Sequence, residues 1–120
     1  MAAYDENNIF ARILRGEIPC KKVYEDAFCL AFHDINPQAP VHVLVIPKAP
    51  YVDFDTFAAE APEDLVAGYM AGIGKTVRVL GLEDDGFRIL ANNGSNGGQE
   101  VPHLHFHIFG GKRLGRMISA

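Results

Sequence analysis

Apolar residues recur along the chain with two different periods, and each period predicts one kind of element. Near the N-terminus, Asn7 and Asn8 precede an apolar stripe that ends at Leu14, and Gly16 with Pro19 follow it; this pattern predicts a short capped helix. Between Pro62 and Leu80, apolar residues fall at intervals of three and four, which predicts a long amphipathic helix. We therefore expect one short N-terminal helix and one long helix.

Short apolar and β-branched runs between turn-forming residues predict five strands. The third and fifth runs are apolar on both faces apart from their histidines, so we expect these strands in the middle of an antiparallel sheet. The fold class is then α+β, with the long helix across one face of the sheet and the functional site on the other. No repeat or linker divides the sequence, so we expect a single domain over residues 1–120 with a C-terminal tail at 112–120. The five runs cover residues 22–24, 28–33, 41–46, 87–91 and 104–109.

The last predicted strand carries three histidines that alternate with large apolar residues. Because a strand places alternate side chains on the same face, His103, His105 and His107 share one face of the sheet. His42 lies on the third predicted strand and joins the cluster if the two strands pair. A lone histidine on a strand is more often structural, but three in register on an apolar strand indicate a functional site.

The segment before this strand, residues 92–99, is polar and contains three glycines. Glycines adopt positive φ easily, and a loop built from them exposes successive backbone N–H groups to an anion. A hairpin connection is the commoner explanation of such a loop by itself. Its junction with the histidine strand favours phosphate binding.

A neutral imidazole is a nucleophile near neutral pH when an acceptor holds its Nδ1 proton, and such a group suits phosphoryl transfer. The rival use of the histidines is a metal site, because His-x-His with a remote histidine resembles a three-imidazole zinc centre. No acidic residue follows the cluster, and Glu100 is the only nearby carboxylate, so the metal site ranks second.

Composition narrows the choice of partners and location. The chain is 48% hydrophobic and 22% charged, as in a soluble globular protein, and its net charge of −4 argues against binding a nucleic-acid backbone. Its apolar runs are shorter than the roughly 18 residues of a membrane helix, so we expect no membrane association. The first residues lack the features of a signal peptide, and a cytoplasmic location follows as the expectation. Cys20 and Cys29 are expected to be free thiols.

The stretch from His103 to Gly111 resembles the signature of the histidine-triad (HIT) family, and its closing Gly110-Gly111 resembles the Hint branch of that family. The likeness extends over nearly the whole chain, through residues 9–10, 16–19, 31–35, 37–40, 42–48 and 97–99. It implies the HIT-like fold. It also implies a homodimer whose two sheets join into one, with a purine nucleoside monophosphate such as AMP or GMP bound to each protomer.

The activity that the resemblance implies is hydrolysis of nucleoside 5'-phosphoramidates, and also of aminoacyl-adenylates, without a cofactor. His105 would attack the α-phosphorus to form a nucleotidyl-histidine, which water then cleaves. His103 and His107 would position and polarise His105, while His42 would contact the phosphate region or assist the leaving group. The resemblance assigns the phosphate to Asn92, Gly98 and Gln99, the ribose hydroxyls to Asp34, and the surroundings of the nucleoside to Ile9, Phe10, Ile13, Phe32, His33, Ile35 and Leu44.

Two departures from the family pattern limit this transfer of roles. Glu100 stands where some relatives carry a hydroxyl residue beside the leaving group, so that hydroxyl role does not carry over. The segment Ile9-Phe10-Ala11 lacks the paired cysteines with which some relatives hold structural zinc, so we predict no structural metal.

Two other functions remain open. One is a dinucleoside polyphosphate hydrolase of the same superfamily, which the Gly110-Gly111 ending disfavours. The other is a nucleotide-binding interaction protein with little turnover, in which the tail at 112–120 engages a partner. A dimer-packing or frayed terminus is the simpler explanation of that basic and apolar tail.

Overall fold

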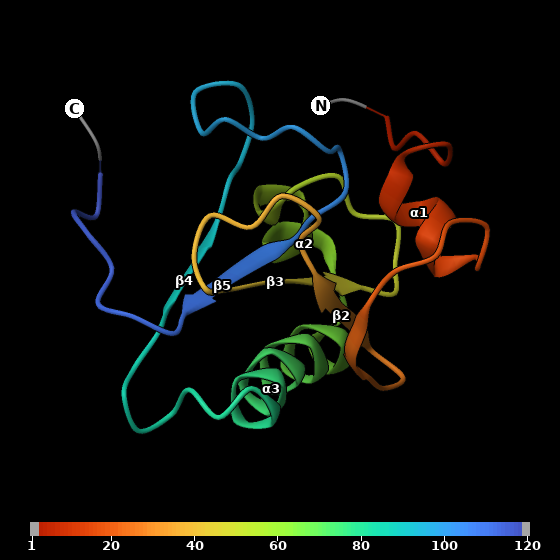
Figure 1. Ribbon diagram of the computed structural model, residues 1–120. Helices are drawn as coiled ribbons and strands as arrows, with labels where there is room; N and C mark the ends of the chain where they lie inside the picture. Colours follow the sequence, from red (N-terminus) through yellow and green to blue (C-terminus); the bar gives the residue numbers. More distant parts are fainter. Residues whose placement is uncertain (1–2, 119–120) are drawn as a thin grey trace.

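The computed structural model describes residues 3–118, which contain three helices and five strands (Figure 1). Among these residues no helix is both long enough and apolar enough to cross a membrane. The elements in chain order are α1 (Ile9–Leu14), β1 (Lys22–Glu25), β2 (Cys29–His33), β3 (Val41–Pro47), α2 (Phe54–Glu60), α3 (Glu63–Val79), β4 (Arg88–Ala91) and β5 (Phe106–Gly110).

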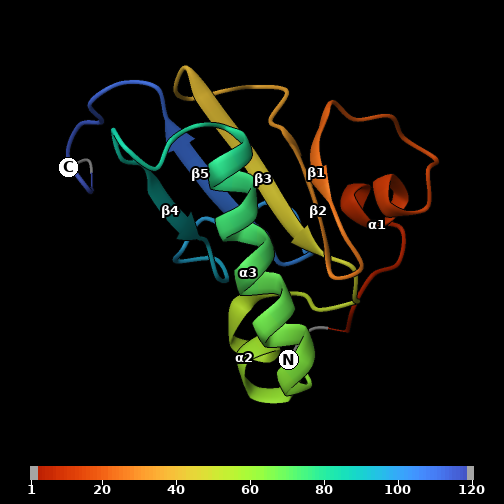
Figure 2. The same ribbon diagram turned by 90° about the horizontal axis from the view of Figure 1, so that it is seen from below.

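The five strands form one antiparallel sheet in the order β1-β2-β3-β5-β4. β3 lies at its centre with β5 beside it, which confirms the expected positions of the third and fifth strands. Figure 2 shows α3 crossing one face of the sheet, with α1 on the side of β1 and β2. The α+β fold class is thereby confirmed.

Alternation along β3 divides the apolar core into two layers. Val43 and Val45 belong to the layer between the sheet and α3, which also contains Leu104 and Ile108. Leu44 and Ile46 point to the opposite face, where they pack with Phe10, Leu30 and Phe32. The α1 face of the sheet is therefore apolar where α1 covers it, and the histidines lie on the same side.

The two expected helices begin and end at the residues that the sequence indicates. Asn8 caps α1, because its Oδ1 atom accepts the Ala11 N–H at 2.9 Å, and Gly16 follows with φ of 77°. Pro62 precedes α3, and Gly81 comes after it with φ of 70°. Both helices end at a position with positive φ, which glycine adopts without the strain that a side chain would cause.

Two features of the fold differ from the expectation. The helix α2 was not expected, and it forms because the Asp53 side chain accepts the Thr56 N–H at 2.8 Å at its start. β5 begins at Phe106 instead of residue 104. The preceding backbone bonds outside the sheet, since the His103 N–H donates to Val101 O at 2.8 Å and the Leu104 N–H to Tyr51 O at 2.9 Å.

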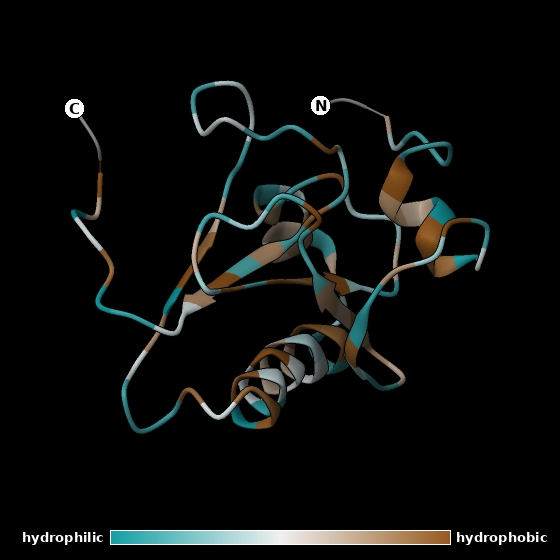
Figure 3. Ribbon diagram, in the orientation of Figure 1, coloured by the Kyte–Doolittle hydropathy of each residue, from teal (hydrophilic) through white to brown (hydrophobic). Residues whose placement is uncertain are grey.

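The loop from β4 to β5 and the tail after β5, as far as residue 118, contain no regular elements. In Figure 3 the loop from β4 to β5 is hydrophilic to neutral for most of its length, whereas the strands carry hydrophobic positions. The tail forms no helix or strand over residues 112–118, and the Arg88 side chain donates to Gly115 O at 2.9 Å and Arg116 O at 3.4 Å. Ser119 and Ala120 of the expected tail lie outside the described residues.

Candidate functional site

The three histidines near the C-terminus and His42 gather on the face of the sheet that α1 occupies. Pairing of β3 with β5 sets Leu44 opposite His107 and His42 opposite Phe109, so the rings of His42 and His107 are diagonal neighbours. The alternation of histidine and apolar residues holds, because Leu104, Phe106 and Ile108 face the α3 layer. His103 and His105 precede the regular strand, and both are buried.

His105 is held in the tautomer that leaves one nitrogen free. Its Nδ1 atom lies 2.8 Å from the carbonyl oxygen of His103. A carbonyl oxygen only accepts, so Nδ1 carries the hydrogen and Nε2 keeps its lone pair. Burial lowers the pKa of His105, which keeps the ring neutral, and the edge of the Phe10 ring packs 4.9 Å from it between centroids. A neutral imidazole with a free Nε2 is a nucleophile.

His103 is bonded at both ring nitrogens. Its Nε2 atom is 3.1 Å from Pro47 O, and its Nδ1 atom is 2.6 Å from the Tyr4 hydroxyl. Burial lowers the pKa of His103 to about 4. The ring is therefore neutral and has no nitrogen available to a ligand.

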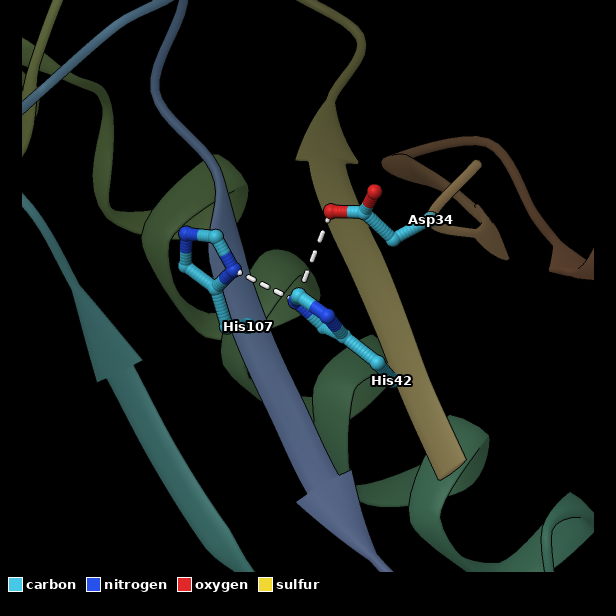
Figure 4. Close-up of side chains that lie close together, drawn as sticks. All are labelled: Asp34, His42 and His107. Carbon is cyan, nitrogen blue, oxygen red and sulfur yellow. Dashed lines mark hydrogen bonds and ion pairs between the residues drawn. The ribbon is translucent and has the colours of Figure 1, made fainter. Parts of the chain in front are cut away.

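His42 lies between His107 and Asp34, as Figure 4 shows. The Gln38 N–H donates to Nδ1 of His42 at 3.1 Å, so the hydrogen of this ring must be on Nε2. That Nε2 atom is 2.9 Å from Nδ1 of His107 and 3.4 Å from Oδ2 of Asp34. Burial lowers the pKa of His42 despite the carboxylate, so Asp34 lies in polar contact with a neutral ring whose Nε2–H donates to His107.

His107 presents a donor that nothing in the protein accepts. Its Nδ1 receives the hydrogen from His42, so its own hydrogen is on Nε2, and Nε2 is the buried side-chain atom without a hydrogen-bond partner among the described residues. Burial, and then the neighbouring His105, lower the pKa of His107 to about 4. An unpaired buried donor costs about 1–3 kcal/mol, which an arriving acceptor would recover.

Asp34, His42 and His107 are also the group that could hold a metal ion among residues 3–118, since one ligand atom from each lies within 4.8 Å of the others. A metal on Nε2 of His42 would move the hydrogen of that ring to Nδ1. The Gln38 N–H already points at Nδ1, so two donors would then face each other. The hydrogen bonds from Gln38 to His42 and from His42 to His107 therefore favour two neutral, hydrogen-bonded histidines over a metal centre.

The predicted nucleoside residues divide into buried and exposed members. Phe10, Phe32 and Leu44 are buried together in the α1 layer, and Ile13 packs against them at the margin. Asp34 lies at the histidines, where its Oδ1 accepts the Asn36 N–H at 2.8 Å. The side chains that project to solvent in the free chain are Ile9, His33 and Ile35, of which Ile35 is 97% exposed.

The donors that were predicted for phosphate in the glycine-rich loop are bonded to other protein groups. The Asn92 side-chain amide donates to Gly97 O at 2.6 Å, and the Gly98 N–H donates to Ser95 O at 3.1 Å. The Gln99 side-chain amide donates to Val52 O at 2.6 Å. In the free chain the hydrogen bonds of these three predicted phosphate ligands stabilise the conformation of the loop.

The sequence did not indicate two partners of the histidines. Tyr4 is 99 positions from His103, and no local sequence pattern predicts their contact. The Gln38 amide is a backbone group in a turn that the proline residues around it do predict, but its target is set by the fold.

A HIT domain family model matches residues 15–114 of the chain. An uncharacterized 13.2 kDa HIT-like protein from Azospirillum brasilense is 60% identical over 97% of this chain and 95% of its own length. A HIT family hydrolase from Legionella pneumophila has a similar structure, with 39% identity, 91% and 96% coverage of this chain and of that chain, and a TM-score of 0.80. A histidine triad nucleotide-binding protein from Candida albicans shares 32% identity over 95% of this chain and 85% of that chain, with a TM-score of 0.77.

Proposed function

The chain belongs to the HIT domain family, and from that premise we propose that it hydrolyses nucleoside 5'-phosphoramidates through a nucleotidyl-histidine intermediate. The names of two relatives, a hydrolase and a nucleotide-binding protein, support the general class of this activity. The preference for a P–N bond rests on the Gly110-Gly111 ending, which resembles the Hint branch.

The observation that carries the proposal is the hydrogen bond from Nδ1 of His105 to the His103 carbonyl at 2.8 Å. It fixes the hydrogen on one nitrogen and leaves the Nε2 lone pair for phosphorus. The carbonyl also stabilises the positive charge that the ring gains once Nε2 is bonded, because Nδ1–H then becomes a stronger donor. Attack and charge stabilisation thus use the same bond.

The reaction runs in two displacements at the α-phosphorus. In the first, Nε2 of His105 forms the N–P bond, and the amine leaves with the electron pair of the old P–N bond and takes up a proton from the solvent. In the second, the oxygen of a water molecule bonds to phosphorus and the bond to His105 breaks. The water gives its proton to the solvent, and the products are the nucleoside monophosphate and a restored neutral His105.

His107 supplies the donor for the phosphoryl group. Its unpaired Nε2–H is the group that a phosphoryl oxygen would satisfy, and His42 holds the ring in the tautomer that keeps this hydrogen in place. His42 has both nitrogens on protein atoms, so in this proposal it acts through His107. A donor fixed before the reaction stabilises developing charge without reorganisation.

The purine nucleoside lies against the α1 side of the site. Asp34 reaches the histidines and accepts the ribose hydroxyls, for which a carboxylate is a suitable partner. The exposed Ile9 and Ile35 are apolar groups without a partner in the free chain, and a base would cover them. Asn92, Gly98 and Gln99 reach the phosphate by exchanging the hydrogen bonds that they make in the free chain.

We also propose the homodimer, with β4 as the edge through which the two sheets join. β4 is an edge strand, and Phe87 and Ile89 at this edge are each 44% exposed. A cavity of about 620 Å³ lies beside it, lined by the loop at 81–88 and the tail at 111–115, and none of the histidines lines it. An unpaired edge with apolar neighbours favours pairing with a second copy. Size-exclusion chromatography with light scattering tests this, and a monomer at micromolar concentration would contradict it.

Hydrolysis of an adenosine 5'-phosphoramidate by the wild type and by His105→Gly tests the activity. Each protein is assayed with and without a chelator, after circular dichroism has confirmed folding, and AMP binding is measured by calorimetry. We expect chelator-resistant turnover by the wild type, and no turnover but retained AMP binding by the variant. AMP binding without turnover by the wild type would favour the nucleotide-binding interaction protein, and faster hydrolysis of diadenosine polyphosphates would favour the related hydrolase.

A further inference from the structure

Tyr4 and His103 are joined by a short hydrogen bond across 99 positions of sequence. The Tyr4 hydroxyl is 2.6 Å from Nδ1 of His103, and the Tyr4 ring meets the imidazole edge-on with centroids 5.6 Å apart. The Nε2 atom of the same imidazole is 3.1 Å from Pro47 O. Since Pro47 O only accepts, the hydrogen of the imidazole is on Nε2, and the Tyr4 hydroxyl is the donor to Nδ1.

Tyr4 lies four residues before the cap of α1. The Asn8 side chain forms that cap: it accepts the Ala11 N–H that starts the helix and donates to Asp5 O at 2.7 Å. Burial raises the pKa of the Tyr4 hydroxyl, so it remains protonated and keeps its role as donor. The bond therefore connects the start of α1 to His103.

The segment that contains His103 lies outside the regular sheet. It precedes β5, and its backbone donates to Val101 O and Tyr51 O instead of to a neighbouring strand. The carbonyl of His103 has to stay 2.8 Å from Nδ1 of His105 to hold the hydrogen of that ring. A ring anchored at both nitrogens fixes the residue to which this carbonyl belongs.

We propose that Tyr4 is a positioning residue for the reaction, whose hydroxyl holds His103 so that the His103 carbonyl keeps the hydrogen of His105 on Nδ1. This inference rests on the proposed role of His105 as nucleophile. Tyr4 touches neither phosphate nor nucleoside in this arrangement. Its effect therefore falls on the chemical step and leaves substrate binding unchanged.

The test compares two substitutions that each remove one tyrosine hydroxyl. Tyr4→Phe keeps the ring beside His103 and deletes the donor. Tyr24→Phe is the matched control, because the Tyr24 hydroxyl donates to Asp26 at 2.8 Å on the α3 side of the sheet. With an adenosine 5'-phosphoramidate, Tyr4→Phe should lower kcat about tenfold at an unchanged KM, the size expected when a reacting group loses part of its positioning. Tyr24→Phe should leave both constants unchanged.

Two further readouts separate positioning from a loss of stability. In ¹⁵N NMR spectra of the histidine rings, Tyr4→Phe should shift Nδ1 of His103 towards the value of an unbonded nitrogen and broaden the Nδ1–H signal of His105. Placing 3-fluorotyrosine at position 4 restores a hydroxyl donor and should restore kcat. A merely structural role predicts a lower unfolding free energy with the Nδ1–H signal of His105 and kcat unchanged.

The outcomes distinguish this inference from the proposed function. If the wild type turns over and Tyr4→Phe keeps the wild-type kcat, the positioning role is wrong and the function stands. If the wild type does not turn over, the proposed function is wrong and the NMR spectra decide alone. An unchanged His105 Nδ1–H signal in Tyr4→Phe would then overturn the inference.

Discussion

The Nε2 atom of His42 lies 2.9 Å from the Nδ1 atom of His107, and the hydrogen between them belongs to His42. The Gln38 N–H determines this, because it occupies the other nitrogen of the His42 ring. The Gln38 amide thus sets the tautomer of His42 directly and, through His42, the tautomer of His107. The result is the free Nε2–H of His107.

Replacing His42 should therefore impair His107. In His42→Leu, Nδ1 of His107 loses its donor inside the protein, at a cost of about 1–3 kcal/mol in unfolding free energy and a fall in kcat/KM of roughly tenfold or more. His42→Gln is the matched variant, because its amide can still donate towards His107, and it should retain more activity than His42→Leu. Urea unfolding and steady-state kinetics measure the two effects. Equal activity of both variants would contradict the claim that a hydrogen bond donated by residue 42 sets the tautomer of His107.

Acidification should destabilise the fold through His103 and His107. Burial lowers both pKa values to about 4, whereas an imidazole in the unfolded chain protonates near 6.5. Between these values the unfolded state binds more protons, so the unfolding free energy falls as the pH drops from about 6.5 to about 4, by at most on the order of 3 kcal/mol for each ring. Above about pH 7.5 these two groups add no pH dependence.

Urea unfolding at a series of pH values from 7.5 to 5 measures this slope. His107→Gln removes one of the two groups, so its slope should be clearly shallower than that of the wild type, whatever its absolute stability. A wild-type stability that is flat or rises on acidification would contradict the neutral state of the two rings.

The sequence predicted the sheet and the histidine face because both depend on local periodicity. Alternation in β3 and around His105 fixes which side chains point to α3 and which to α1, and the structure follows it. The central position of β3 and β5 followed from the apolar runs at 41–46 and 104–109. The alternation in the sequence fixes the orientation of a strand wherever one face of that strand is buried.

The features that the sequence did not predict are one short helix and several contacts that the fold determines. The helix α2 has only seven residues, and its capping Asp53 sits in a run without a long apolar stripe. β5 begins late because the backbone before it bonds to Val101 and Tyr51. The tautomers of the histidines depend on Tyr4, Gln38 and Pro47, and a pattern of residue types does not specify tautomers.

Zinc should bind weakly at Asp34, His42 and His107, although the three side chains are close enough to coordinate it. Coordination at Nε2 of His42 would break the bond to His107 and leave the Gln38 amide facing a ring N–H. We expect purified protein to contain no stoichiometric zinc by elemental analysis, and calorimetric titration with zinc to give a dissociation constant above about 10⁻⁵ M, well weaker than that of a structural site. Stoichiometric zinc that survives dialysis, together with loss of turnover on chelation, would overturn this prediction.

The long helix approaches the sheet closely at Gly72. A Cβ atom added there would lie 2.4 Å from Sγ of Cys29, and Cys29 is wholly buried on β2. At Gly74, on the same helix, the nearest atom to an added Cβ is Nη1 of Arg78 at 3.6 Å. Glycine at 72 therefore serves packing between α3 and β2, while glycine at 74 serves no contact of this kind.

Gly72→Ala and Gly74→Ala should accordingly change stability in opposite directions. Alanine favours a helix over glycine by about 1 kcal/mol, and Gly74→Ala should gain up to that amount. Gly72→Ala gains the same propensity but overpacks the core, so we expect a net loss of about 1–2 kcal/mol in unfolding free energy. Adding Cys29→Ala removes the sulfur that the new methyl group meets, so the double variant should be more stable than the sum of the two single changes predicts. Strict additivity in urea unfolding would mean that α3 shifts to accommodate the methyl group and that Gly72 does not set its distance from β2.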